Sequence, residues 1–115
     1  MKVPHVTLHV RDIEKSIAFY KAVAQIDIQL DLRQFESPIV FLADDKESTK
    51  IELIHDPEHA FQGSGISVGF TAESAEAEMD RIKALGFETT GMISPNPNTH
   101  FFYVTDPDGF KVQII

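Results

Sequence analysis

The stretch Thr99–Ile115, THFFYVTDPDGFKVQII, decides the fold of this chain because it contains two strands joined by a tight turn. Residues 101–104 are a run of β-prone side chains, and residues 110–115 alternate between apolar and polar positions. Between them, residues 106–109 read Asp-Pro-Asp-Gly, which are the residue types that a β-turn prefers. Gln113 lies between two apolar residues of the second strand, so its side chain must face water or a polar cavity.

The composition predicts one globular domain. The 115 residues are enough for a hydrophobic core, and 43% of them are hydrophobic and 24% charged. The absence of cysteine excludes disulfides, thiolate metal sites and a cysteine nucleophile. The net charge of −8 argues against a nucleic-acid partner and mildly favours a cationic ligand over an anionic one. No apolar leader or membrane-length apolar run is present, so we expect a cytoplasmic protein with no membrane partner.

Hydrophobic periodicity predicts the order β-α-β-β-β twice along the chain. Helix N-caps are expected at Asp12 and Ser74, and Gly86 is expected to end the second helix. The buried stripe of that helix is expected to include Leu85, and a loop is expected at 91–98. The expected strands are 3–10, 25–33, 39–43 and 49–55, then 66–71, 87–90, 101–104 and 110–115, with helices at 15–24 and 75–85.

The repeat predicts an α+β fold in which two paired βαβββ modules form a cupped, eight-stranded mixed sheet with the helices outside. Within this single domain, module 1 is expected at about 1–56, a linker at about 57–64 and module 2 at about 65–115.

Four polar positions follow the same repeat. Ser67 follows His5 by 62 residues, and Gln113 follows Glu52 by 61 residues. Each is expected on the strand face opposite the one that packs on a helix. If each module curls its strands around that face, the four side chains converge inside a cleft.

Three motifs carry a resemblance that covers essentially the whole chain: HVTLHVRDIEKSIAFYKAV near the start, KIELI at 50–54, and FFYVTDPDGFKVQII at the end. They are similar to those of the vicinal oxygen chelate superfamily, which includes glyoxalase I, fosfomycin resistance proteins, extradiol dioxygenases and bleomycin-binding proteins. The resemblance implies a glyoxalase-like fold. It leaves the chemistry open, since this scaffold hosts lyases, transferases, oxygenases and pure binders.

The resemblance also implies where a metal would bind. His5 and Glu52 match two ligand positions of the metal-dependent members, whereas Ser67 replaces a His and Gln113 replaces a Glu. A site of His5, Glu52 and Gln113 would suit one Ni, Zn, Mn or Fe ion, with Glu52 as ligand and proton acceptor. The alternative, which we favour, is a degenerate site without tightly bound metal.

Other side chains are candidates for contact with a ligand. His9 shares the strand face of His5, but it can equally end the strand in solvent. His100 begins the penultimate strand, either at the mouth of the cleft or as a surface histidine. The cluster at 55–59 is interpreted as a solvated linker. The candidate ligand-binding residues are His5, Thr7, His9, Phe35, Ser67, His100, Tyr103 and Gln113.

Two functional hypotheses therefore remain. One is a small-molecule-binding protein related to glyoxalase and bleomycin resistance proteins, which holds an aromatic or cationic compound. The other is a divalent-metal-dependent lyase, isomerase or transferase of glyoxalase I type that acts on a substrate with two neighbouring oxygens. In either case we expect a homodimer, because each module exposes sheet edges and an apolar face.

Overall fold

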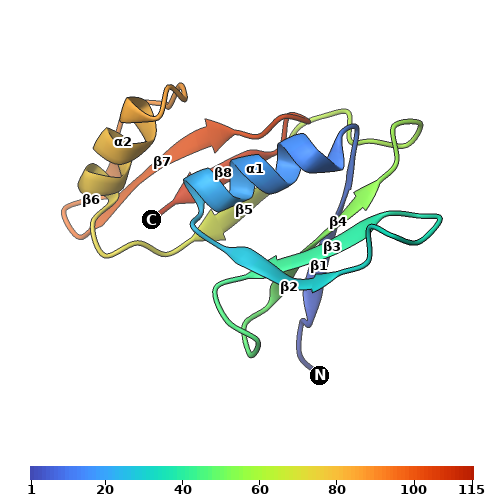
Figure 1. Ribbon diagram of the computed structural model, residues 1–115. Coiled ribbons are helices and arrows are strands. Elements are labelled where there is room, and N and C mark those ends of the chain that lie inside the picture. Colours follow the sequence, from blue (N-terminus) through green and yellow to red (C-terminus); the bar gives the residue numbers. More distant parts are fainter. The chain divides into compact units, whose positions relative to one another are not determined.

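A computed structural model describes residues 1–115 and divides the chain into two compact units, Met1–Gln62 and Gly63–Ile115 (Figure 1). The predicted α+β architecture is confirmed, since each unit has one helix and a four-stranded mixed sheet. Neither helix has the length and apolar character needed to cross a membrane. The elements of unit 1 are β1 (His5–Val10), α1 (Ile13–Val23), β2 (Asp27–Asp31), β3 (Ile39–Ala43) and β4 (Lys50–His55). Those of unit 2 are β5 (Ser67–Phe70), α2 (Ala75–Ala84), β6 (Ile93–Asn96), β7 (Thr99–Thr105) and β8 (Lys111–Ile114).

The two sheets have the same topology and register. Their strand orders are β1-β4-β3-β2 and β5-β8-β7-β6, and in each sheet the first strand pairs in parallel with the last. The other neighbours are antiparallel. Thr7 lies opposite Glu52 in unit 1, and Gly69 lies opposite Gln113 in unit 2. The internal repeat read from the sequence is therefore a repeat of strand register as well as of element order.

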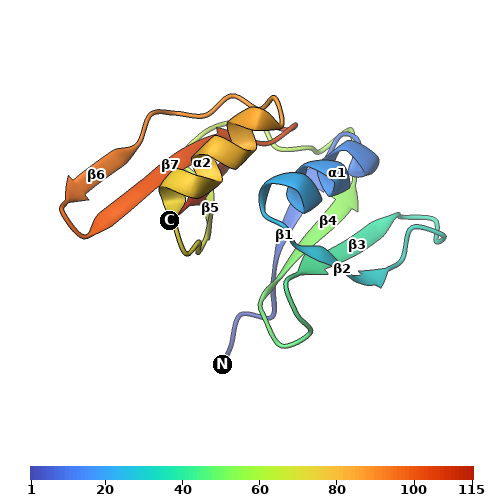
Figure 2. The ribbon, with the colours of Figure 1, turned by 60° about the vertical axis from the view of Figure 1, so that its left-hand side comes forward.

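In unit 1, α1 packs on one face of the sheet, next to β4 (Figure 2). The helix begins two residues earlier than predicted because the Asp12 side chain accepts hydrogen bonds from the backbone N–H groups of Glu14 and Lys15 at 3.1 and 3.2 Å. The core of this unit is apolar and consists mainly of Leu8, Val10, Ile17, Tyr20, Val23, Val40, Leu42, Ile51 and Leu53.

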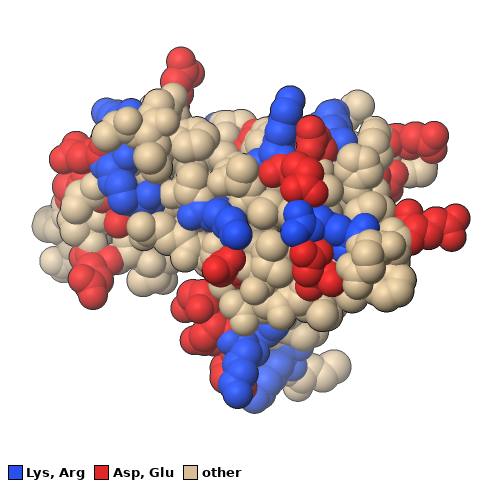
Figure 3. Space-filling view, viewed as in Figure 1, with Lys and Arg blue, Asp and Glu red and all other residues tan.

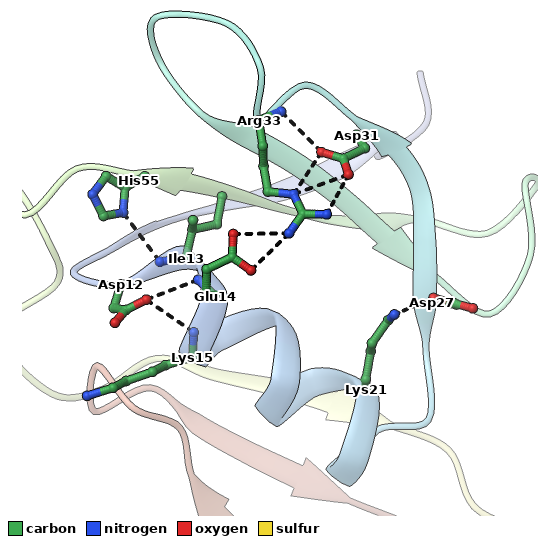
Figure 4. Close-up of polar contacts among 9 residues, drawn as sticks. All are labelled: Asp12, Ile13, Glu14, Lys15, Lys21, Asp27, Asp31, Arg33 and His55. Atoms are coloured by element: carbon green, nitrogen blue, oxygen red, sulfur yellow. Dashed lines mark hydrogen bonds and ion pairs between the residues drawn. The ribbon is translucent and has the colours of Figure 1, made fainter.

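An arginine ties the end of β2 to this helix (Figure 4). Both the Arg33 Nε and Nη2 groups bond to the Asp31 carboxylate, and Nη1 bonds to both oxygens of Glu14 at 3.0 and 2.9 Å. The hydrogen bonds from Arg33 lower the pKa of Asp31 to about 2. This network fixes the strand edge that lies farthest from β1.

In unit 2, α2 packs against β7 and begins after Ser74, whose Oγ accepts from the Ala77 N–H at 3.1 Å. Met79 and Ile82 are buried as predicted, but the prediction for Leu85 is wrong because its side chain is 53% exposed. Leu85 is the C-cap residue, so it lies beyond the last turn that contacts the sheet. Gly86 then ends the helix with a φ of 96°.

The next strand lies later in the chain than predicted. Residues 87–90 form no strand, and β6 forms inside the segment that was expected to be a loop. Residues 87–90 contact β7 through Thr90. The backbone N–H of Thr90 donates to the Tyr103 carbonyl, and its hydroxyl accepts from the Tyr103 N–H. Pro95 fits in β6 because this is an edge strand, where a missing N–H breaks no central ladder.

The predicted Asp-Pro-Asp-Gly turn is confirmed. The Asp106 Oδ1 atom accepts from the backbone N–H groups of Asp108 and Phe110, both at 2.9 Å, and Gly109 has a φ of 97°. Asp106 is only 4% exposed, so its carboxylate holds the turn together from inside the protein. This buried carboxylate sets the register of β7 against β8 and thereby the position of Gln113.

Candidate functional site

Unit 1 has one sheet face packed on α1 and one face turned away from it. We call the second the open face of unit 1; it carries His5, Thr7 and His9 from β1, Phe41 from β3 and Glu52 from β4. These residues alternate along their strands with the buried core residues, which is the pattern expected of a strand with one packed face.

Glu52 is the centre of the open face. Its Oε1 atom accepts a hydrogen bond from the Thr7 hydroxyl at 2.5 Å and lies 3.5 Å from His5 Nε2. The His5 ring meets the Phe41 ring edge-on, with 5.5 Å between centroids. The Glu52 side chain is 13% exposed, and its Oε2 atom has no protein partner. An oriented carboxylate with one unpaired oxygen can accept a hydrogen bond from a ligand or contribute one ligand to a cation.

A second polar cluster lies at the other end of β1. Asp56 Oδ2 is 2.8 Å from His9 Nδ1, and Asp56 Oδ1 is 3.0 Å from His59 Nδ1. The hydrogen bond to His9, followed by that to His59, lowers the pKa of Asp56, and Asp56 in turn raises the pKa of His59. This segment was expected to be solvated linker. The cluster forms because β1 and β4 run in parallel and therefore end side by side, a register that the sequence does not specify.

The equivalent face of unit 2 carries weaker donors. Gly69 stands where unit 1 has Thr7, and a Cβ added there would lie 3.2 Å from Gln113 Oε1. The amide of Gln113 therefore extends over the glycine. Ser67 and Tyr103 share this face, and Lys111 Nζ lies 5.9 Å from the centre of the Tyr103 ring.

Two predicted ligand-binding residues are not brought to these faces. The side chain of His100 lies on the opposite face of β7 from that of Tyr103, on the side of α2. There its Nδ1 is 2.9 Å from Ser94 Oγ and 3.5 Å from Glu76 Oε1. Phe35 is 61% exposed in the loop between β2 and β3, at the sheet edge opposite β1.

The donor chemistry fits a two-carboxylate metal site poorly. Unit 1 offers the imidazole of His5 and the carboxylate of Glu52, while the equivalent positions of unit 2 offer the hydroxyl of Ser67 and the amide of Gln113. No group of three or more His, Asp or Glu side chains in the chain gathers with a geometry that could hold a metal ion. The candidate site is therefore a partly buried carboxylate framed by a hydroxyl, an imidazole and an aromatic ring.

Comparison with known proteins gives a consistent family. The model of the glyoxalase/bleomycin resistance protein/dioxygenase superfamily matches residues 2–114. A lactoylglutathione lyase from Salmonella typhimurium is 30% identical over 100% of this chain and 92% of the relative. A probable lactoylglutathione lyase from Vibrio parahaemolyticus is 28% identical over 99% of this chain and 89% of the relative.

Solved structures show the same fold at lower sequence identity. An antibiotic-binding protein from a Streptomyces species superposes with a TM-score of 0.82 at 20% identity, over 99% of this chain and 93% of that chain. The Leishmania major glyoxalase I superposes with a TM-score of 0.79 at 16% identity, over 100% and 86%. With the family model matching nearly every residue, this chain belongs to the glyoxalase/bleomycin resistance protein/dioxygenase superfamily.

Proposed function

We propose that this protein binds a small organic molecule on the open face of unit 1 and that its metal site is degenerate. The observation that carries the proposal is the state of Glu52, which Thr7 and His5 orient while one of its carboxylate oxygens remains unpaired. The corresponding strand pair of unit 2 offers no second carboxylate and no imidazole at Ser67 and Gln113.

The chemistry of the open face also indicates what kind of molecule fits. Phe41 offers an aromatic surface beside the carboxylate, and aromatic rings meet such surfaces favourably in offset or edge-on geometry. Glu52 accepts hydrogen bonds, so the ligand needs a donor or a positive charge next to its ring. An aromatic compound with one donor group is therefore the class that we expect.

A binding screen with two matched variants tests this proposal. Aromatic compounds are screened by thermal shift and the hits mapped by NMR on ¹⁵N-labelled protein, where the amides of β1, β3 and β4 should move. Phe41→Ala should weaken a hit at least about tenfold, as expected when an aromatic contact is lost. Phe35→Ala removes an aromatic side chain that lies away from the open face and should leave the affinity unchanged. Hits that map only to unit 2, or that bind Phe41→Ala as well as the parent, contradict the proposal.

A second candidate function is a metal-dependent lyase, and the names of the curated relatives favour it. In that case His5 and Glu52 would be ligands, with Gln113 as a weaker third ligand, and Glu52 would also accept a proton. Protein purified without added metal, then dialysed against Ni, Zn, Mn or Fe, would hold one ion per chain and melt at a higher temperature. It would also turn over lactoylglutathione. Loss of that turnover in Glu52→Gln would complete the case, whereas protein without stoichiometric metal would exclude it.

We also propose that the protein functions as a homodimer. Each sheet has two edge strands that are paired on one side only, β1 and β2 in unit 1 and β5 and β6 in unit 2. Large apolar side chains lie exposed near the β2 edge, with Leu30 50% and Phe35 61% accessible. Exposed edges and apolar side chains of this kind are usually covered by another chain.

A further inference from the structure

An open pocket of about 770 Å³ lies in unit 1, where the N-terminal segment passes the turn between β3 and β4. Two hydrogen bonds hold the N-terminal segment against the start of β4 at this pocket. The Thr49 hydroxyl donates to the Val3 carbonyl at 2.8 Å, and the Lys50 N–H donates to the Pro4 carbonyl at 3.0 Å. The lining residues are Lys2, Val3, Pro4, His5, Phe41, Glu47, Ser48, Thr49 and Lys50. Since it includes His5 and Phe41, the pocket continues the open face toward the start of β1.

The pocket differs in charge from the rest of the molecule. The chain as a whole carries a net charge of −8, whereas this lining has two lysines, Lys2 and Lys50, against the single carboxylate of Glu47. The Asp45 carboxylate of the same turn lies outside the lining and interacts electrostatically with Lys50. Figure 3 shows basic side chains at the bottom of the view, with acidic side chains beside them, where Figure 1 places the N-terminus and the turn between β3 and β4. Local charge governs which group a pocket attracts at short range, since salt screens the more distant charges within about 8–10 Å.

One of the lysines is held in place. Lys50 Nζ donates to the carbonyl oxygens of Lys46 at 2.8 Å and Ser48 at 3.0 Å. An ammonium group has three N–H donors, so one remains for a ligand. Because the turn already orders this side chain, a ligand that bonds to it loses less conformational entropy on binding than one that must immobilise a flexible lysine.

We propose that this pocket is a subsite for the carboxylate of an organic anion whose apolar body lies against Phe41. Lys50 keeps one N–H donor and Lys2 adds a second ammonium group, while the carboxylates of Glu47 and Asp45 limit the local positive charge. A singly charged carboxylate therefore fits better than a doubly charged phosphate. Val3 and Pro4 offer apolar walls beside the lysines. The inference rests on the proposed function, because it assigns one end of the molecule that the open face would bind. It also reverses the preference for a cationic ligand that the net charge alone suggests.

The test uses three compounds of nearly the same shape, the 4-hydroxy derivatives of benzoate, benzamide and benzamidinium, which are anionic, neutral and cationic. Their shared phenol hydroxyl is the donor that Glu52 requires, and each compound is named below by its parent. Each is titrated into ¹⁵N-labelled full-length protein at low salt, and the amides of residues 2–5 and 47–50 report on the pocket. Benzoate should bind there at least about fivefold more tightly than either of the other two compounds, and added salt should reduce the difference.

Two lysine variants test whether the lysines of the lining cause the preference for benzoate. Lys50→Gln and Lys2→Gln should each remove most of the preference for benzoate. Lys46→Gln is the matched control, because its side chain does not line the pocket and only its carbonyl contacts Lys50. If benzamide or benzamidinium binds the open face as well as benzoate does, the proposed function stands and the carboxylate subsite is wrong. An equal loss in Lys46→Gln also overturns the subsite. If none of the three compounds binds, the subsite and its parent proposal both fail.

Discussion

Replacing Asp106 by alanine should destabilise the protein strongly, because this carboxylate satisfies two backbone donors inside the turn between β7 and β8. Its Oδ1 atom accepts from the N–H groups of Asp108 and Phe110, both at 2.9 Å, and the residue is only 4% exposed. A buried donor left without a partner costs about 1–3 kcal/mol, so two of them cost about 2–6 kcal/mol. Removing a buried charge also removes its desolvation cost, which brings our expectation to about 2–4 kcal/mol.

The assay is urea and thermal unfolding followed by circular dichroism. For a chain of this size, the expected loss corresponds to a fall in the melting temperature of about 8–16 °C. Asp45→Ala is the matched control. Its Oδ1 atom also accepts from two backbone N–H groups, those of Glu47 and Ser48, both at 2.8 Å, but in an exposed turn where water can replace it. The control should lose less than a third as much stability. Equal losses in the two variants would refute the reasoning, because burial would then not decide the cost.

Three further predictions follow from the site and the fold. The Asp56 carboxylate raises the pKa of His59, so Asp56→Asn should lower that pKa toward its ordinary value of about 6.5 in an NMR titration. The pair should stabilise the parent most between about pH 4 and 6.5, and this stabilisation should fade as the pH rises through the pKa of His59; an unchanged His59 titration would exclude the contact. Ser67→His combined with Gln113→Glu restores the donors that the family resemblance implies, and should raise divalent-metal affinity at least about tenfold over the parent by isothermal titration calorimetry. If the double variant binds metal no better than the parent, the four repeat positions do not form one site. Light scattering at tens of micromolar should give the mass of a dimer, and a monomer mass would reject the proposed assembly.

The fold was predictable because local signals agreed with one another along most of the chain. Alternating strands, the caps at Asp12 and Ser74 and the Asp-Pro-Asp-Gly turn each specify local backbone geometry, and the repeat then constrains the topology. β6 was not predictable in this way. Its residues are all exposed and include Pro95, so what makes them a strand is their pairing with β7 rather than a pattern of their own.

Part of the candidate site was likewise predictable from the sequence and part was not. That Thr7 and Glu52 share a face follows from strand parity, but their direct contact depends on the parallel register of β1 and β4, which only the folded sheet supplies. The cluster around Asp56 depends on the same register. The polar character of 55–59 led to its interpretation as linker, because charged side chains near a turn are usually solvated. The side of β7 on which His100 lies likewise depends on where that strand begins its alternation.

The parallel pairing of each first strand with the last strand of its unit has a consequence for synthesis on the ribosome. β1 has no partner until β4 has been made, so unit 1 becomes complete only near Gln62. At about 5–20 residues per second, the 53 residues of unit 2, Gly63–Ile115, then take roughly 3–10 s to translate, which leaves unit 1 time to fold first. In unit 2 the partner of β5 is β8, which ends at Ile114, so this sheet can close only after that strand has been made. A premature stop just before Lys111 would therefore leave both β5 and β7 without their shared neighbour, β8.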